Sequence, residues 1–407
     1  MSTATKTYEY SVRDRTGKLV TGKLDAPNQA ALVTKLKHMG YAPMSVREQG
    51  GGMNKELSLP GGNKVKLKDL AVMSRQFATM INSGLSMMRS LSILAEQTES
   101  KGLKGALTGV RNEVEAGGSL STSLAKHPQV FPPLMINMCR AGEVGGFLDT
   151  TLLSIAENFE SEVKLRSKIK SAMTYPVVVF VIAIIAVVGM LLFIVPVFTG
   201  MFSDLGGELP APTKALVFLS AAMKVAAPIG VVGLVVFSAV WPKVRHRHGV
   251  RSFLDPLKLK VPIFGNLFAK VALARFARNL GTMIRSGVPI LQSLEIVGET
   301  CGNLVLERAA RDVQESVRKG DSLAGPLANH AIFPAMMVQM LAVGEDTGAM
   351  DTMLAKLADF YDQEVEATTE ALTSLIEPLM IAVLGSIIGG MIIALYMPIF
   401  GVFELIA

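Results

Sequence analysis

Cysteine is scarce in this chain of 407 residues, which contains only Cys139 and Cys301. Neither cysteine belongs to a CxxC pair or to a cysteine-rich segment, so the sequence argues against a disulfide framework and against a zinc site. A free cysteine often behaves as a small buried hydrophobic residue. We therefore expect both thiols to be buried, in a reducing compartment, and we predict no bound metal.

The chain also lacks a phosphate-binding loop, because no GxxxxGK[ST] segment occurs in it. A motor driven by ATP on this chain is thereby excluded, and any nucleotide chemistry must belong to a partner. The apolar runs at residues 177–195 and 379–397 contain few of the polar side chains that an intramembrane enzyme would need. We predict that the protein is not an enzyme and holds no cofactor.

The first residues, MSTATKTYEYSVRDRTGKL, lack the apolar core of a signal peptide. We expect no cleavable signal, and we expect the first membrane span to serve as the insertion signal.

Long apolar runs are present elsewhere, at residues 177–195, 225–241 and 379–397. As a helix, the first run would cover about 28 Å, which is close to the hydrocarbon thickness of a bilayer. Half of all residues are hydrophobic, yet 18% are charged, which is too many for a chain buried wholly in lipid. We predict three membrane spans that alternate with soluble domains.

Basic residues flank these spans unevenly. Residues 198–213, between the first two spans, contain no Lys or Arg. The opposite ends of the same spans carry Lys164, Arg166, Lys168, Lys170, Lys243, Arg245, Arg247, Arg251, Lys258 and Lys260. Cytoplasmic ends carry such an excess, so we predict that residues 1–170 and 243–370 are cytoplasmic and the C-terminus external. The basic run after the second span suits anionic headgroups better than nucleic acid.

An internal repeat organises the chain. Three segments recur at an offset of about 203 residues. The pairs are 75–91 with 278–294, 117–127 with 320–330, and 131–149 with 333–351. The prolines Pro176 and Pro196 match Pro378 and Pro398 in the same register. A helical domain and its following span therefore occur twice, whereas the second span has no counterpart.

The periodicity within each repeat is helical. A stripe at steps of three and four comprises Leu148, Leu152, Ile155, Phe159 and Val163, with Met350, Leu354, Leu357, Tyr361 and Val365 as equivalents. Turn signals divide each repeat, and we predict mostly α structure with about six helices per bundle. Residues 7–48 instead alternate around a turn, which predicts a small β-β-α-β module.

These patterns predict the following domain order: N-terminal module 1–49, flexible linker 50–66, cytoplasmic bundle 67–170, span 171–198, external loop 199–214, span 215–242, basic cytoplasmic connector 243–268, cytoplasmic bundle 269–374, span 375–400 and external tail 401–407.

Each bundle contains one copy of a glycine-rich acidic motif. Its members are Gly142, Glu143, Gly146 and Asp149 in the first bundle, and Gly344, Glu345, Gly348 and Asp351 in the second. The two glutamates have three open interpretations. They contact a partner, or they bind a divalent cation together with the aspartates. Alternatively, the glycines end one helix and each glutamate favours the dipole of the next helix.

Other residues have a structural interpretation. Gly84 and Gly287 suit tight turns between helices. Ser119 and Ser322 precede apolar runs as N-caps do. His127 and His330 lack neighbours at ligand spacing, so we place them in loops. Glu377, beside Pro378, is expected at the membrane interface, where an ionisable group is less costly than in mid-membrane.

The repeated GxSL sequence, the FPxxM…GExxGxxD segment, the three spans and the small N-terminal module resemble the type II secretion F family over essentially the whole chain. Its members are cytoplasmic-membrane platform proteins of bacterial type IV pilus and type II secretion machines. The resemblance implies that the chain couples a hexameric assembly or retraction ATPase to the extraction of pilin or pseudopilin subunits. It also implies other inner-membrane assembly proteins, membrane lipid and further copies of the chain as partners.

An oligomeric channel or transporter component is the alternative, because duplicated units are common in transporters. Both copies here have the same orientation, however, and spans without central charges offer little to coordinate a solute.

Overall fold

The computed structural model describes residues 6–13, 19–26, 29–38, 41–48, 65–204, 209–244, 248–262 and 264–406. It divides the chain into two compact units, Met1–Gly62 and Asn63–Ala407. The predicted linker at 50–66 falls outside the described residues, apart from its last two positions.

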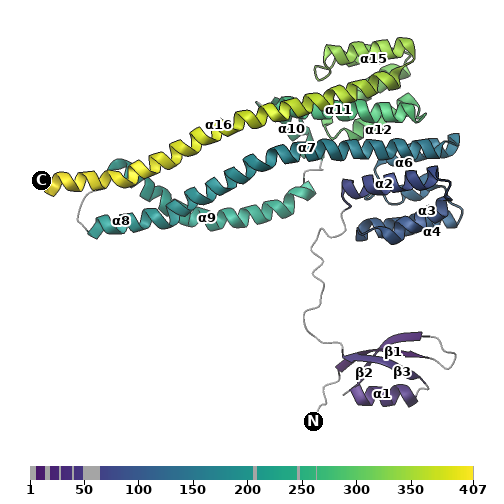
Figure 1. Ribbon diagram of the computed structural model, residues 1–407, viewed down its shortest axis with the longest axis horizontal. Helices are drawn as coiled ribbons and strands as arrows, with labels where there is room; N and C mark the ends of the chain where they lie inside the picture. The colour runs from purple at the N-terminus through teal and green to yellow at the C-terminus, as the bar shows by residue number, and fades with distance from the viewer. Residues whose placement is uncertain are drawn as a thin grey trace. The chain divides into compact units, whose positions relative to one another are not determined.

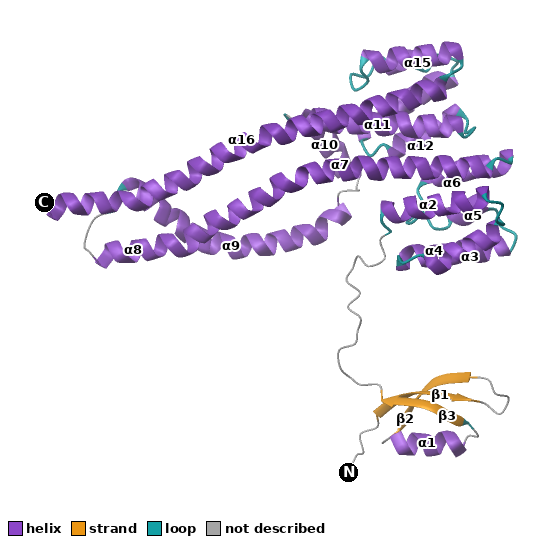
Figure 2. Cartoon of the chain, viewed as in Figure 1, coloured by secondary structure: helices purple, strands orange, loops and turns teal. Residues whose placement is uncertain are grey.

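The first unit is a small antiparallel sheet with one helix (Figure 2). Its elements are β1 (Lys6–Arg13), β2 (Leu19–Ala26), α1 (Gln29–His38) and β3 (Ala42–Glu48). The strand order is β2-β1-β3, and β1 pairs with β2 from Lys6 opposite Ala26 to Arg13 opposite Leu19. Leu32 and Leu36, four residues apart on α1, are buried together with Ala26, so one face of the helix forms the core of this unit.

The second unit begins with one set of helices (Figure 1). They are α2 (Leu67–Asn82), α3 (Met87–Gln97), α4 (Lys101–Glu115), α5 (Leu120–Ala125), α6 (Pro133–Gly145) and α7 (Leu148–Gly189). A π-helix, η1 (Met190–Ile194), then joins α7 to α8 (Val195–Asp204), and α9 (Ala211–Val244) and α10 (His248–Lys260) follow.

The second copy has the corresponding helices in the same order. They are α11 (Phe264–Arg285), α12 (Ile290–Thr300), α13 (Leu304–Arg318), α14 (Ala324–Leu327), α15 (Ala335–Thr347) and α16 (Met350–Ile406). Helix α11 starts earlier than α2 does in its repeat, because Phe264, Leu267 and Val271 pack against apolar residues of the two long helices, including Leu165 and Val365.

The predicted apolar stripe is confirmed as the core face of the long helices. Leu152, Ile155 and Phe159 of α7 are buried, whereas Leu148 and Val163 pack at the edge of the same core. In the second repeat, the matching stripe of α16 is buried in the same way from Leu354 to Val365. Helix α7 therefore packs on α2, and α16 packs on α11.

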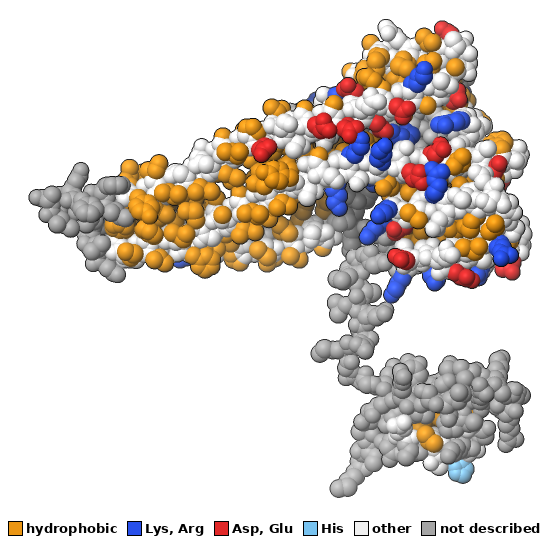
Figure 3. Space-filling model, viewed as in Figure 1, with side chains coloured by type: hydrophobic (Ala, Val, Ile, Leu, Met, Phe, Trp, Pro, Cys, Tyr) orange, Lys and Arg blue, Asp and Glu red, His pale blue; other side chains and the backbone are white. Residues whose placement is uncertain are grey.

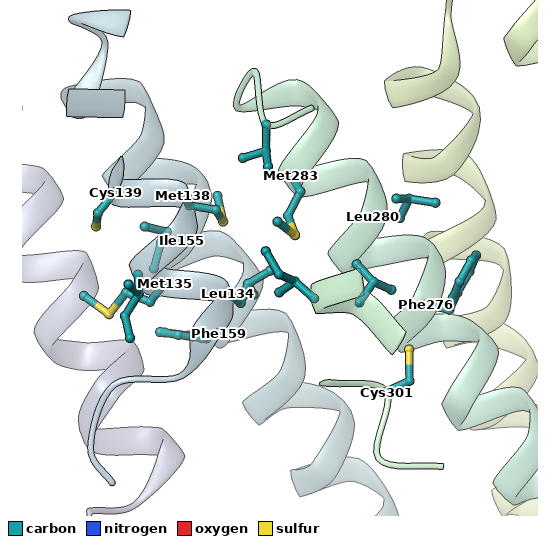
Figure 4. Packing of buried hydrophobic residues seen from close by; sticks show 14 of the residues in the cluster. Leu134, Met135, Met138, Cys139, Ile155, Phe159, Phe276, Leu280, Met283 and Cys301 are labelled. Atoms are coloured by element: carbon teal, nitrogen blue, oxygen red, sulfur yellow. The ribbon is translucent and has the colours of Figure 1, made fainter. Parts of the chain in front are cut away.

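The two bundles share one hydrophobic core. Buried residues of both repeats, among them Met138 and Met283, belong to a single cluster (Figure 4). Polar contacts accompany it: the Asn158 amide donates to Asn279 Oδ1 over 3.1 Å, and Arg275 forms an ion pair with Glu162 over 2.7 Å. The repeats are therefore duplicated in sequence but packed as one body.

Three helical segments of the described chain are long and apolar enough to cross a membrane, namely Leu148–Phe202, Ala211–Trp241 and Met350–Pro398. They extend from the bundles as a region with mostly hydrophobic side chains, and the charged side chains gather over the bundles (Figure 3). The long helices continue without interruption through Pro176 in α7 and through Pro378 and Pro398 in α16.

Candidate functional site

The duplicated acidic motif lies against the N-terminus of a very short helix. In the first repeat this helix is α5, and the Glu143 carboxylate reaches it from α6. The backbone N–H groups of Leu120 and Ser121 donate to Glu143 over 2.5 and 3.0 Å. Thr122 N–H donates to Ser119 Oγ over 3.2 Å. The first amides of a helix have no partner within it, and here side chains satisfy three of them.

The second repeat reproduces this arrangement. Leu323 N–H donates to both carboxylate oxygens of Glu345, over 2.8 and 2.9 Å, and Ala324 N–H lies 3.4 Å from one of them. Gly325 N–H donates to Ser322 Oγ over 3.2 Å. The expected N-cap serines thus accept amide protons in both copies, although helix α14 itself begins only after Leu323.

The glutamates therefore differ from their predicted structural role in one respect. The sequence placed each glutamate near the N-terminus of the next helix, whereas the structure places it inside α6 or α15 and directs its carboxylate to the preceding helix. The reason is tertiary, because α5 packs on α6 and α14 packs on α15. A carboxylate at a helix N-terminus is favoured by the dipole as well as by the hydrogen bonds.

Two of the motif glycines end a helix, as predicted, whereas the other two lie inside the helix at close contacts that had not been predicted. Gly146 and Gly348 end their helices with φ of 76° and 70°, in the left-handed region that favours glycine. A Cβ at Gly142 would lie 2.7 Å from Thr151 Oγ1, and a Cβ at Gly344 would lie 3.0 Å from Met353 Cγ. These glycines let α6 and α15 approach the long helices that follow them.

The motif aspartates lie at the start of the two long helices. Asp149 lies in the first turn of α7 and Asp351 in the first turn of α16, where a negative charge favours the helix dipole. Within the described ranges, no group of three or more His, Cys, Asp and Glu side chains is arranged to hold a metal ion.

The remaining predicted residues occupy turns, loops and a helix surface. Gly84 and Gly287 adopt φ of 82° and 68° in the turns after α2 and α11, as predicted. His127 and His330 lie in the loops before α6 and α15. Glu377 is exposed on α16, one residue before Pro378.

Both cysteines are buried and unpaired, as expected. Burial in the core raises the pKa of the Cys301 thiol to about 12, and it also raises the pKa of Cys139. A thiol is nucleophilic only as the thiolate, so neither cysteine is a reactive group.

A repeated ion pair had not been predicted. Arg75 of α2 binds the Glu160 carboxylate of α7 through two nitrogens, at 2.7 and 2.5 Å. The equivalent pair in the second repeat is Arg278 with Asp362. The hydrogen bond from Arg75 lowers the pKa of Glu160. The repeat alignment contains the signal for these pairs, since both positions preserve their charge across the two copies.

Known proteins match this sequence along nearly the whole chain. The profile described as type II secretion system (T2SS), protein F matches residues 73–196 and 276–398, and that of its N-terminal domain matches residues 2–47. The type IV pilus assembly protein PilC of Myxococcus xanthus is 43% identical over 98% of this chain and 95% of that protein.

Two further relatives have similar coverage. The protein of the same name from Thermus thermophilus is 41% identical, over 97% of both chains. The type II secretion system protein F of Vibrio cholerae is 31% identical, over 96% of this chain and 97% of that protein.

Proposed function

Because this chain belongs to the type II secretion system protein F family, we propose that it is the inner-membrane platform on which a type IV pilus or type II secretion fibre is assembled. The protein is a multi-pass inner-membrane protein with three apolar helices.

Within that role, the chain couples a hexameric cytoplasmic ATPase to the extraction of pilin or pseudopilin subunits, and it has no catalytic activity of its own. The bundles lie in the cytoplasm and the C-terminus lies outside, as the basic flanks of the spans indicate. Other inner-membrane assembly proteins and further copies of the chain complete the platform. Residues of the acidic motif help to shape the cytoplasmic surface that meets these partners.

The continuity of the two long helices is the observation that carries this proposal. Helix α7 runs from Leu148 in the first bundle to Gly189 in the span, and α16 runs from Met350 to Ile406. A tilt or rotation imposed on either bundle would therefore reach its span without a flexible joint. The ion pair between Lys168 and Glu366, at 2.5 Å, ties the two helices together near the bundle end of the spans.

An insertion tests the coupling. Gly-Gly-Ser-Gly-Gly placed after Ser171, between the packed Ile169 and the apolar run that begins at residue 177, should abolish fibre assembly while expression, membrane insertion and ATPase binding persist, since glycines break a helix. The same insertion after Pro128, in the exposed loop between α5 and α6, is the matched control. Normal fibre assembly by the Ser171 variant would contradict the coupling.

A further inference from the structure

Helix α9, the span without a counterpart in the repeat, packs one face against the other two spans. Leu216, Val217 and Met223 of this face contact the cluster formed by Leu191 and Met391 and their neighbours. Two hydroxyl residues, Thr213 and Ser220, are buried among the spans, with 3% and 4% exposure. Their spacing of seven residues is close to two helical turns, so both lie on one side of α9.

Thr213 contacts the backbone of α16 at a position that lacks its normal partner. The Thr213 hydroxyl donates to the Ala394 carbonyl over 2.5 Å. In an α-helix this carbonyl would accept from the N–H four residues later, but residue 398 is proline and has no N–H. The hydroxyl from α9 takes the place of the missing donor.

Ser220 does the same for the first repeat. Its hydroxyl donates to the Leu191 carbonyl over 2.5 Å. In the π-helix η1 the register is one residue longer, and Val195 N–H donates to the Met190 carbonyl. The next donor in this register would be residue 196, which is Pro196, so the Leu191 carbonyl has no partner in its own helix.

We propose that α9 is a brace, in which Thr213 and Ser220 act as positioning residues that satisfy the two carbonyls left free by the repeat-equivalent prolines. An unsatisfied carbonyl buried among helices is costly, because it gives up its hydrogen bonds to water and gains no other partner. Any shift of α9 along the spans would leave both carbonyls without their donors at once. The brace thus fixes the register of all three spans, and, if the proposed function holds, it makes the spans of both repeats move together.

Double-mutant cycles on the full chain in lipid nanodiscs test the brace. Thr213→Val and Ser220→Ala should each lower the Tm, whereas Thr213→Ser and Ser220→Thr should retain it. In a Pro398→Ala background, which restores the N–H, Thr213→Val should lose most of its effect, and Pro196→Ala should do the same for Ser220→Ala. Equal Tm losses with and without each proline would overturn the proposal.

Ser238→Ala is the matched control, because this exposed α9 hydroxyl donates to the Val235 carbonyl of its own helix. The Tm of this variant should not change. Fibre assembly gives the functional readout, and the double variant Thr213→Val, Ser220→Ala should lose it although it is inserted and folded. Normal assembly by that variant would overturn the role of the brace in coupling. The platform function itself would fail only if cells without the gene still assembled fibres.

Discussion

A single carboxylate caps one short helix in each bundle. Glu143 and Glu345 are helix residues by position, yet each one satisfies the free amides of a helix that lies more than twenty residues earlier. A helix as short as α5 or α14 cannot persist alone, so the carboxylate and the cap serine specify it. The duplicated GxSL and GE sequences therefore form one structural unit, in which the donating amides and their carboxylate acceptor lie more than twenty residues apart in the chain.

Glu345→Ala should lower the free energy of unfolding by about 0.5–1.5 kcal/mol, because it removes the acceptor of the Leu323 and Ala324 amides at a position that water reaches. Asp346→Ala, at the exposed neighbouring position, is the matched control and should stay within about 0.5 kcal/mol of the wild type. The Tm of each purified full-length variant is compared with the Tm of the wild type, and the larger loss of stability gives the larger decrease. Equal effects of the two substitutions would show that Glu345 contributes only surface charge.

Single helices have distinct faces that decide which substitutions the bundle tolerates. Helices α7 and α16 each present one stripe to the core, and the same helices continue as spans that expose apolar side chains to lipid. A hydrophobic residue of these helices therefore packs in the core in the bundle part and faces lipid in the span. In the bundle part, Phe159 has only 4% of its surface exposed, whereas Phe360, which lies beside the core residue Tyr361, has 38% exposed.

Phe159→Asp should prevent folding of the first bundle, because it combines the loss of a buried aromatic ring, worth about 3–5 kcal/mol, with the burial of an unpaired charge. Phe360→Asp should leave the fold intact, since water reaches that side chain. The yield of monodisperse protein in detergent and its Tm distinguish the two. A well-folded Phe159→Asp protein would mean that the apolar stripe is not essential to the core.

At the scale of the whole molecule, the two repeats form a single packed unit within residues 63–407. Because the core is shared, each bundle buries part of its apolar surface against the other. The unrepeated helix α9 packs against the spans of both repeats. Because both native cysteines are buried and the pKa of Cys301 is raised to about 12, an introduced thiol reports only its own position.

Cysteines at Glu99 and Glu315, which are exposed on the two bundles, should react with an impermeant maleimide only in inside-out vesicles. A cysteine at Gly206, between the first two spans in sequence, should react only in intact cells or spheroplasts. The parent protein, whose two cysteines are both buried, serves as the blank. Labelling of Gly206→Cys from the cytoplasmic side would reverse the orientation that the basic residues predict.

The sequence by itself determined the features that depend on local pattern. Apolar length defines the spans, periodicity defines the core stripe, and the repeat register aligns Pro196 with Pro398. Each of these depends on residues that are near one another in the chain or that recur at a constant offset. The turns at Gly84 and Gly287 were predictable for the same reason, because a positive φ is a local requirement.

Only the tertiary structure decided which distant groups meet. That Glu143 caps α5 rather than the next helix, and that Thr213 and Ser220 satisfy carbonyls beside two prolines, depends on how helices pack, which no spacing in the sequence encodes. The fusion of both bundles into one core has the same origin. Hydrophobic burial is non-directional, so an apolar stripe shows that a face is covered but not which helix covers it.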